Sequence, residues 1–384
     1  MIQKFRKIRR LKRFETPEHS YKAQLSLTDE HSSLTVGPEE VFLRSVIKSH
    51  QQPRNADFAV FALCALSMSK NWEISVDFPV TESAVSQCRK IANAYRLWSI
   101  DVLAPLRLNF EKIVPSEPPT HKPGIICVSG GLDSMSAAIE AVQAGDTTGA
   151  LLVAGADYAS ASNSGFVELR DRVQRISDIL SLDLHIMETN LRKVGFHWNM
   201  MHSFNLAFCL HHHAAQYGFG TFAQDNNALQ DLFRMPWGNL NVLPELFTTT
   251  TFKITTSGKD KDRVGKLRTV LEYDDKLLEH LSVCYTNKSI GGNCGRCPKC
   301  IQTRIALEAV GMNGRGLFEA EPDLVKAVKK FETPKKLSVV RGRMARTTEL
   351  VDALPDGELR DALIAFETKL RWRFHALMPS MDAK

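Results

Sequence analysis

The sequence has no apolar run long enough for a membrane-spanning helix. Its longest apolar stretch, residues 58–66, is far shorter than the roughly 18–20 residues that cross a bilayer. No secretory signal peptide is visible. The eight cysteines then indicate a reducing compartment, in which clustered cysteines bind metal more often than they form disulfides. We therefore expect a cytoplasmic protein without a membrane contact.

Acidic side chains are absent from residues 1–14, which carry seven lysines and arginines and which we call the basic arm. Since the chain of 384 residues has a formal net charge of +6, the part behind the arm is nearly neutral. Apolar residues recur at every third position of the arm, which favours a folded first element with a solvated basic face. A contact with nucleic acid or an acidic protein, or a cleaved transit peptide, stays open as an alternative.

The first 120 residues predict a domain of mixed helices and strands. Residues 15–36 are polar and show no clear period, whereas later segments follow a helical or a strand period. The predicted elements are helices at 38–49, 56–69 and 81–98 and strands at 72–78 and 106–110. Four prolines between Pro115 and Pro123 can continue neither a helix nor a central strand, so we place a domain boundary there.

Short, wholly apolar strands alternate with helices in the region that follows. We predict these strands at 124–128, 150–154, 184–189 and 220–223. Strands of this kind belong to a parallel sheet with helices on both faces. The fold class is therefore α/β, with a Rossmann-like parallel sheet in residues 121–283. An α+β domain (1–120) precedes it, and a metal knot with helices (284–384) follows.

A glycine-rich loop, Ser129-Gly130-Gly131-Leu132-Asp133-Ser134, lies between the first of these strands and the next helix. Its glycines allow a tight turn. Helix-start amides and the hydroxyls of Ser129 and Ser134 can donate hydrogen bonds to phosphate oxygens. Asp133 would repel a bare phosphate, so we expect it to act with Mg²⁺ or to hold the turn. The loop matches neither the Gly-x-x-x-x-Gly-Lys-Ser/Thr motif nor Gly-x-Gly-x-x-Gly.

This loop resembles that of the PP-loop ATP pyrophosphatases. In that superfamily the loop grips the β- and γ-phosphates of ATP, which leave as pyrophosphate, and the α-phosphate passes to a substrate oxygen as AMP. The resemblance implies an ATP site formed by Ser129, Gly130, Gly131, Leu132, Asp133 and Ser134, with Mg²⁺ as cofactor. We place Asp157, just past the second strand, near the adenine and ribose.

Four cysteines form the second strong motif: Cys284, Cys294, Cys297 and Cys300. Thiolates at Cys-x-x-Cys spacing suit a tetrahedral Zn²⁺ ion, and nothing in the sequence indicates an open coordination position. An iron–sulfur cluster, which also takes four cysteines, is the alternative. The other cysteines lie in apolar segments and are predicted as core residues, namely Cys64, Cys88, Cys127 and Cys209.

Together, the loop and the cysteine motif resemble 7-cyano-7-deazaguanine synthase and its enlarged relatives, which include members of bacterial anti-phage defence systems. The resemblance covers about residues 124–310. It implies that the segment Asp225-Asn226-Asn227 faces the substrate. Arg263 and Lys266, at the start of a predicted helix, would neutralise pyrophosphate or a substrate carboxylate.

The predicted reaction is an ATP-dependent ligation, with Asp133, Arg263 and Lys266 as catalytic residues. A carboxylate or carbonyl oxygen attacks the α-phosphorus and pyrophosphate leaves. A nitrogen nucleophile then displaces AMP to give an amide or a nitrile. The acceptor would be a deazapurine, a small metabolite or a protein. The alternatives are an RNA-modifying PP-loop enzyme and a nucleotide-binding sensor or scaffold in a multiprotein system, and a homodimer also stays open.

Overall fold

The computed structural model describes residues 14–99, 102–118, 122–195, 197–234, 237–284, 286, 292–314 and 316–378. Apart from Phe14, which is buried, the basic arm lies outside these ranges, and so do the predictions made for it. Within them, no helix combines the length and the apolar character needed to cross a bilayer.

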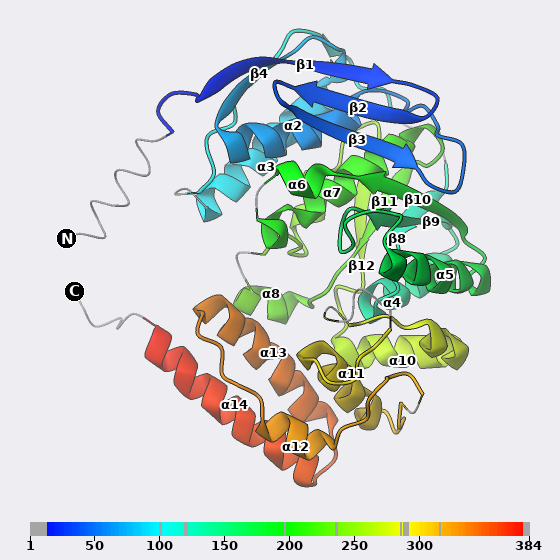
Figure 1. Ribbon diagram of the computed structural model, residues 1–384, viewed down its shortest axis with the longest axis vertical. Coiled ribbons are helices and arrows are strands. Elements are labelled where there is room, and N and C mark those ends of the chain that lie inside the picture. The colour runs from blue at the N-terminus through cyan, green and yellow to red at the C-terminus, as the bar shows by residue number, and fades with distance from the viewer. Residues whose placement is uncertain are drawn as a thin grey trace, which may run out of the picture.

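Ten strands join into one large sheet (Figure 1). Their order across the sheet is β12-β11-β8-β9-β10-β3-β2-β1-β4-β6. The strands are β1 (His19–Leu27), β2 (His31–Val36), β3 (Glu39–Ser45), β4 (Trp72–Val76), β6 (Leu108–Phe110), β8 (Gly124–Cys127), β9 (Thr147–Ala154), β10 (Asp183–Thr189), β11 (Phe219–Ala223) and β12 (Lys253–Ser257). Strands β5 (Val80–Thr81) and β7 (Ile113–Val114) pair separately.

The strands of the predicted core, β8 to β12, are parallel to one another. Along the chain the sheet grows from β8 through β9 to β10, and it then returns to the other side of β8 with β11 and β12. This reversal places a switch point between β8 and β11. Open α/β sheets bind ligands beyond the carboxyl ends of their strands at such a point. The structure thus confirms an α/β fold with a large, mostly parallel sheet.

The N-terminal region adds its strands to the same sheet. Strand β3 pairs antiparallel with β10, with Leu43 opposite Thr189, and β2 and β1 continue the antiparallel order. A salt bridge of 2.6 Å between Arg44 and Glu188 also joins β3 to β10. The regions before and after the proline-rich boundary therefore share one sheet.

The helix predicted at residues 38–49 is wrong, because this segment contains strand β3. Its side chains alternate between core and solvent: Val41 and Leu43 are fully buried, whereas Glu40 is exposed. The polar residues 15–36, for which no element was predicted, contain β1 and β2. These segments form strands because they pair with neighbouring strands. Such pairing cannot be predicted from the local hydrophobic period of the sequence.

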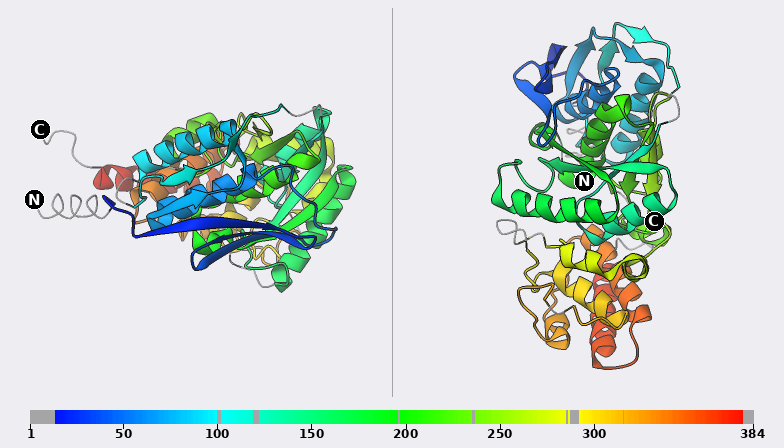
Figure 2. Two further views of the ribbon diagram at one scale, coloured as in Figure 1. Left: turned by 90° about the horizontal axis from the view of Figure 1, so that it is seen from above. Right: turned by 90° about the vertical axis from the view of Figure 1, so that its right-hand side faces the viewer.

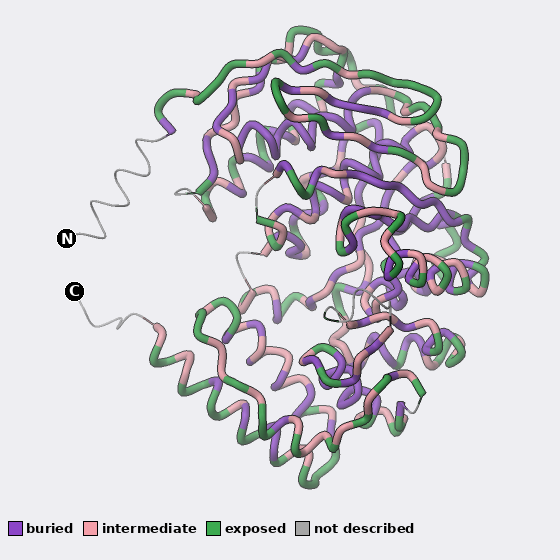
Figure 3. Tube along the Cα trace, in the orientation of Figure 1, coloured by how far each residue is buried: buried purple, intermediate pink, exposed green. Residues whose placement is uncertain are grey.

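Helices cover both faces of the sheet, and buried residues run along its central strands (Figure 3). In β8 and the residue that follows it, Ile125 and Cys127 face one hydrophobic cluster, while Ile126 and Val128 face the other. The first face carries α2 (Asp57–Lys70), α3 (Glu82–Trp98), α6 (Leu191–Val194), α7 (Trp198–His212) and α9 (Leu243–Leu246). The second face carries α4 (Leu132–Gln143), α5 (Ser164–Ile179) and α10 (Arg263–Tyr273).

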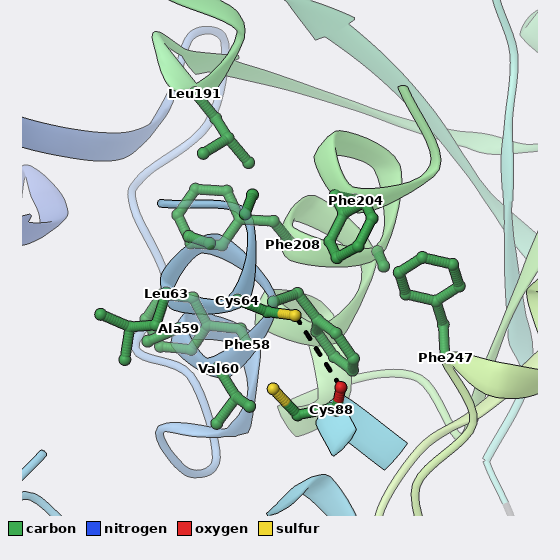
Figure 4. Close-up of a cluster of buried hydrophobic side chains, with 14 of the residues drawn as sticks. Phe58, Ala59, Val60, Leu63, Cys64, Cys88, Leu191, Phe204, Phe208 and Phe247 are labelled. Carbon is green, nitrogen blue, oxygen red and sulfur yellow. Dashed lines mark hydrogen bonds between the residues drawn. The ribbon is translucent and has the colours of Figure 1, made fainter. Parts of the chain in front are cut away.

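The cysteines outside the four-cysteine motif are core residues, as predicted: Cys64, Cys88, Cys127 and Cys209 are all buried. Figure 4 shows Cys64 of α2 and Cys88 of α3 among phenylalanines from α2, α7 and the segment after α9. The Cys64 Sγ lies 3.8 Å from the carbonyl oxygen of Cys88. Helices α2 and α7 thus join the N-terminal region and the parallel core through one hydrophobic cluster.

The C-terminal region is helical and lies at the opposite end of the molecule from the N-terminal strands (Figure 2). It consists of α11 (Pro298–Ala309), α12 (Leu324–Lys329), α13 (Leu337–Ala353) and α14 (Glu358–Leu377). Helix α13 packs against α14 and also against α8 (Ala228–Arg234), which follows β11. The C-terminal region therefore reaches back to the end of the parallel sheet where ligands are expected.

Candidate functional site

The glycine-rich loop lies at the carboxyl end of β8, directly at the switch point. Gly130 has a φ of +72°, a left-handed conformation that favours glycine. The Ser134 hydroxyl closes the loop, because it accepts a hydrogen bond from the Ser129 N–H (3.0 Å) and donates one to the Gly131 carbonyl (3.0 Å). Helix α4 begins at Leu132, so the N–H groups of its first turn have no partner within the helix. Such groups suit an anion.

The buried side chain of Lys266 ties this loop to the neighbouring strand. Its ammonium lies 2.8 Å from Asp133 Oδ1 and donates to the carbonyl of Gln224, just past β11, at 2.5 Å. Arg263, at the start of α10, lies 3.7 Å from the other Asp133 oxygen. Burial alone would raise the pKa of Asp133, but Lys266 and Arg263 hold this pKa well below its ordinary value. The structure therefore brings the three predicted catalytic residues together.

A cleft with two connected parts opens in front of the loop. The narrower part, about 130 Å³, is lined by the loop residues other than Gly130, by Arg263 and by residues 282–284. The wider part, about 340 Å³, extends past the ends of β8, β9 and β11. Both parts share the lining residues Ser129, Asp133, Ser134, Asp157, Tyr158, Leu169 and Lys299. Asp157, predicted near the adenine and ribose, thus lies in the cleft beside the loop.

Aromatic side chains form one wall of the wider part. Trp198 and His202 from the start of α7 and Trp237 line it. The His202 ring centroid lies 5.5 Å from that of Trp237 and 6.0 Å from that of Trp198. Burial lowers the pKa of His202, although Asp225 acts in the opposite direction, so this imidazole is neutral at pH 7. Flat aromatic walls suit a planar ring system.

Asp225, the first residue of the predicted substrate segment, lines the wider part at the end of β11. Its Oδ1 accepts hydrogen bonds from Trp237 Nε1 (3.2 Å) and Asn239 Nδ2 (3.3 Å). The guanidinium groups of Arg234 and Arg346 lie 4.0 and 3.9 Å from its Oδ2. Arg234 also stacks on Trp237, with 3.9 Å between the guanidinium carbon and the ring centroid. Asp225 is therefore the centre of a charged cluster that faces the cleft.

Asn226 and Asn227 are not among the residues that line the cleft. Asn226 is buried, and its side chain donates to Asp231 at 3.3 Å. The Asn227 side chain accepts a hydrogen bond from the Gln230 N–H at 2.9 Å and so caps α8. These two residues hold the segment after β11 in its conformation, and they present Asp225 to the cleft.

Two cationic residues of the site escaped sequence reasoning. Lys299 of α11 lines both parts of the cleft, and Arg346 of α13 reaches Asp225 from the C-terminal region. Burial, together with Arg234 and Arg263, lowers the pKa of Arg346 to about 10, so that its guanidinium is still charged at neutral pH. The position of Lys299 between two clustered cysteines was a signal for it. Nothing in the sequence connects Arg346 with the cleft.

Helix α13 also holds the start of α10. The Glu349 carboxylate accepts hydrogen bonds from the N–H groups of Arg263 and Val264, the second at 3.2 Å. The same carboxylate accepts a hydrogen bond of 2.6 Å from the Gln230 side chain in α8. The C-terminal region therefore positions the helix that carries Lys266.

The four cysteines of the second motif converge on one point. Their Sγ atoms all lie within 4.8 Å of one another, with 4.0 Å between Cys284 and Cys297 and 3.9 Å between Cys294 and Cys300. An ion with four Zn–S bonds of about 2.3 Å separates its sulfurs by about 3.8 Å. An iron–sulfur cluster distributes its cysteines over several irons and so needs wider spacing. The group therefore fits a single metal ion.

Side chains and backbone around the cysteines hold them in this arrangement. The buried Asn293 side chain accepts hydrogen bonds from the N–H groups of Val283 (2.9 Å) and Cys284 (3.3 Å). Gly295 has a φ of +70°, and a Cβ there would lie 1.8 Å from the carbonyl oxygen of Ala320. Glycine is therefore required where the chain turns between the second and third cysteines.

The site combines a glycine-rich loop, a buried ion pair and a four-cysteine group around one cleft. Compared with known proteins, the chain matches no family model, no curated protein and no solved structure. Its function is therefore inferred from the residues of the cleft.

Proposed function

We propose that this protein binds MgATP in the cleft and transfers AMP to a carboxylate or carbonyl oxygen with release of pyrophosphate. The observation that carries this proposal is the loop of residues 129–134 at the switch point, with Lys266 and Arg263 at 2.8 and 3.7 Å from Asp133. A phosphate chain on this loop would accept hydrogen bonds from the N–H groups in the first turn of α4. It would also be attracted by the positive charges of Lys266 and Arg263. The resemblance of the loop to that of the PP-loop ATP pyrophosphatases supports the same function.

Asp133 has two tasks in this proposal. In the structure it neutralises Lys266 and Arg263, which lie close to it. When phosphates occupy the narrower part of the cleft, Arg263, which lines it, can turn to the phosphate oxygens. The Asp133 carboxylate is then available as an oxygen ligand for the Mg²⁺ that accompanies ATP. Lys266 is buried and does not line the cleft, so it would keep its contacts with Asp133 and the Gln224 carbonyl and hold this carboxylate in place.

The acceptor would bind in the wider part of the cleft, next to the α-phosphate. Its oxygen forms a bond to the α-phosphorus while the bond from that phosphorus to the bridging oxygen breaks, so pyrophosphate leaves and an acyl-adenylate forms. A nitrogen nucleophile then attacks the activated carbon and AMP departs with its oxygen. A carboxylate acceptor gives an amide. When the acceptor is itself an amide, its activated oxygen leaves with AMP and its nitrogen loses two protons, which gives a nitrile. The aromatic walls at Trp198 and Trp237 favour a planar acceptor such as a deazapurine.

We also propose Zn²⁺ as the metal of the cysteine group. Cys284, Cys294, Cys297 and Cys300 would hold it through their thiolates. Four protein ligands leave no open coordination position, so the ion would stabilise the fold and take no part in the chemistry.

The test is product analysis with labelled ATP. Purified protein is incubated with Mg²⁺, with ATP labelled at the α- or the γ-phosphate, and with carboxylated deazapurines, small carboxylic acids or cell extract. AMP and pyrophosphate in equal amounts are expected, and ADP with inorganic phosphate would contradict the proposal. Ser134→Ala opens the loop and should lower turnover about tenfold or more. The matched control Ser338→Ala, at an exposed position of α13, should leave turnover unchanged.

The same experiment separates the alternatives. Tight binding of ATP without any AMP or pyrophosphate, under all acceptor conditions, would favour a nucleotide-binding sensor or scaffold. Turnover that requires RNA and leaves a modified nucleotide in it would favour an RNA-modifying enzyme.

A further inference from the structure

The cysteine group and the nucleotide cleft are structurally connected. Ser282 and Cys284 line the narrower part of the cleft. The Ser282 N–H donates a hydrogen bond of 2.8 Å to the carbonyl of Gly130, so the segment that leads to the first cysteine is bonded to the glycine-rich loop. From the other side of the cysteine group, Lys299 lines both parts of the cleft.

Lys299 lies in the first turn of α11, between Cys297 and Cys300. Cys297 caps this helix, because its Sγ accepts a hydrogen bond from the Cys300 N–H at 3.5 Å. A metal ion held by these two thiolates would fix the backbone on both sides of Lys299. The Lys299 side chain is itself exposed, so a ligand in the cleft can reach its ammonium.

The other cations of the site described above have carboxylate partners, whereas Lys299 has none among the described residues. Lys266 and Arg263 share Asp133, and Arg346 lies 3.9 Å from Asp225. Lys299 forms no salt bridge with any residue that the structure describes. An anion that enters the cleft can therefore bind this ammonium without displacing a carboxylate first.

We propose that Lys299 is a phosphate-binding residue of the cleft, and that metal bound to the cysteine group raises the affinity for nucleotide. The metal would act by fixing Lys299 on one side of the cleft and the Gly130 loop on the other. This inference rests on the proposed ATP site and adds a task to the cysteine group beyond stabilising the fold. Since coupling between two binding sites is reciprocal, bound nucleotide must also hold the metal more tightly.

The first experiment measures binding of Mg²⁺ with α,β-methylene-ATP, which cannot release pyrophosphate, by isothermal titration calorimetry. Arg296 offers a matched control, because it also lies inside the cysteine motif but lines a different cavity, of about 540 Å³. Lys299→Met keeps a chain as long as the aliphatic part of lysine but lacks the ammonium, and it should weaken binding about tenfold or more. Lys299→Arg and Arg296→Met should stay within about threefold of the unsubstituted protein, since the first keeps the charge and the second lies outside the cleft. Metal content should be the same in all four proteins.

The second experiment measures the release of metal from the holoprotein to a chromophoric chelator. In the unsubstituted protein and in Arg296→Met, Mg²⁺ with α,β-methylene-ATP should slow the release. In Lys299→Met this protection should be largely lost, because the residue that connects the two sites no longer binds phosphate. This readout does not depend on turnover.

Unchanged affinity in Lys299→Met would overturn the inference while leaving the ATP site intact. Equal weakening in Lys299→Met and Lys299→Arg would also overturn it, because it would indicate a packing role instead of a charge. Metal release that is insensitive to the nucleotide in the unsubstituted protein would overturn the coupling. If the unsubstituted protein does not bind α,β-methylene-ATP at all, the proposed function itself fails, which is a distinct result.

Discussion

The Lys266 ammonium lies 2.8 Å from the Asp133 carboxylate, and this contact joins two segments that are 133 residues apart in the chain. The Lys266 side chain is only 1% exposed. This carboxylate and the carbonyl of Gln224 therefore replace water as the partners of its ammonium. Asp133 is also the residue that we expect beside the phosphates of ATP. In the proposed function, folding and nucleotide binding thus depend on the same atoms, and we expect substitutions here to change both.

Asp133→Asn should lower the free energy of unfolding by about 3 kcal/mol, because it leaves the buried Lys266 ammonium without its anion. The folded-state pKa of Asp133 lies below its unfolded value. The stabilisation is therefore complete above about pH 4 and disappears as the pH falls further. Urea denaturation between neutral and acidic pH measures both effects. The double variant Asp133→Asn/Lys266→Met should lose less stability than the sum of the single variants, and strict additivity would contradict the ion pair.

Gly295→Ala should lower both metal content and stability, because its Cβ would lie 1.8 Å from the Ala320 carbonyl oxygen. Gly311→Ala is the matched control, since Gly311 has a similar φ of +76° with nothing within 4 Å. The control should cost only the backbone strain of about 1 kcal/mol and keep its metal. Metal analysis together with thermal unfolding distinguishes the two variants. Equal effects of the two substitutions would show that the cysteine group tolerates movement of its backbone.

Acid should destabilise the protein through its buried histidines. Burial lowers the pKa of His211 to about 4 and that of His213 to about 4. Between pH 6.5 and pH 4 these two histidines are therefore protonated in the unfolded chain but neutral in the folded protein. The free energy of unfolding then falls as the pH drops from about 6.5 to about 4, by about 1.4 kcal/mol per pH unit for each histidine. His213→Gln should make this dependence shallower in urea denaturation, and a flat profile in the unsubstituted protein would contradict the burial.

Nucleotide or acceptor binding should quench tryptophan fluorescence, because Trp198 and Trp237 line the cleft. The quench should be much smaller in Trp198→Phe and Trp237→Phe. Trp372→Phe is the control, since Trp372 is 74% exposed on α14 and lies outside the cleft. Titration with Mg²⁺ and α,β-methylene-ATP, followed by addition of the acceptor, measures the effect. A quench that survives both cleft substitutions would place the ligand elsewhere.

The features that could be predicted from the sequence are those whose residues lie close together in the chain. The loop of residues 129–134 follows an apolar strand within one short segment, and three of the four cysteines lie within seven residues. Strand β3 and the contact of Arg346 with Asp225 depend on segments far apart in the chain, so local patterns do not predict them. The proximity of Lys266 to Asp133 was expected only through the family resemblance.

Strand β3 restricts movement between the N-terminal region and the parallel core. It continues the sheet from β10 through main-chain hydrogen bonds, and the Arg44–Glu188 salt bridge strengthens the junction. A hinge rotation between the N-terminal region and the parallel core would have to break these main-chain hydrogen bonds, so we expect the two halves of the sheet to move together. Any movement of the C-terminal helices relative to the parallel core would instead have to break the contacts that Arg346 and Glu349 make.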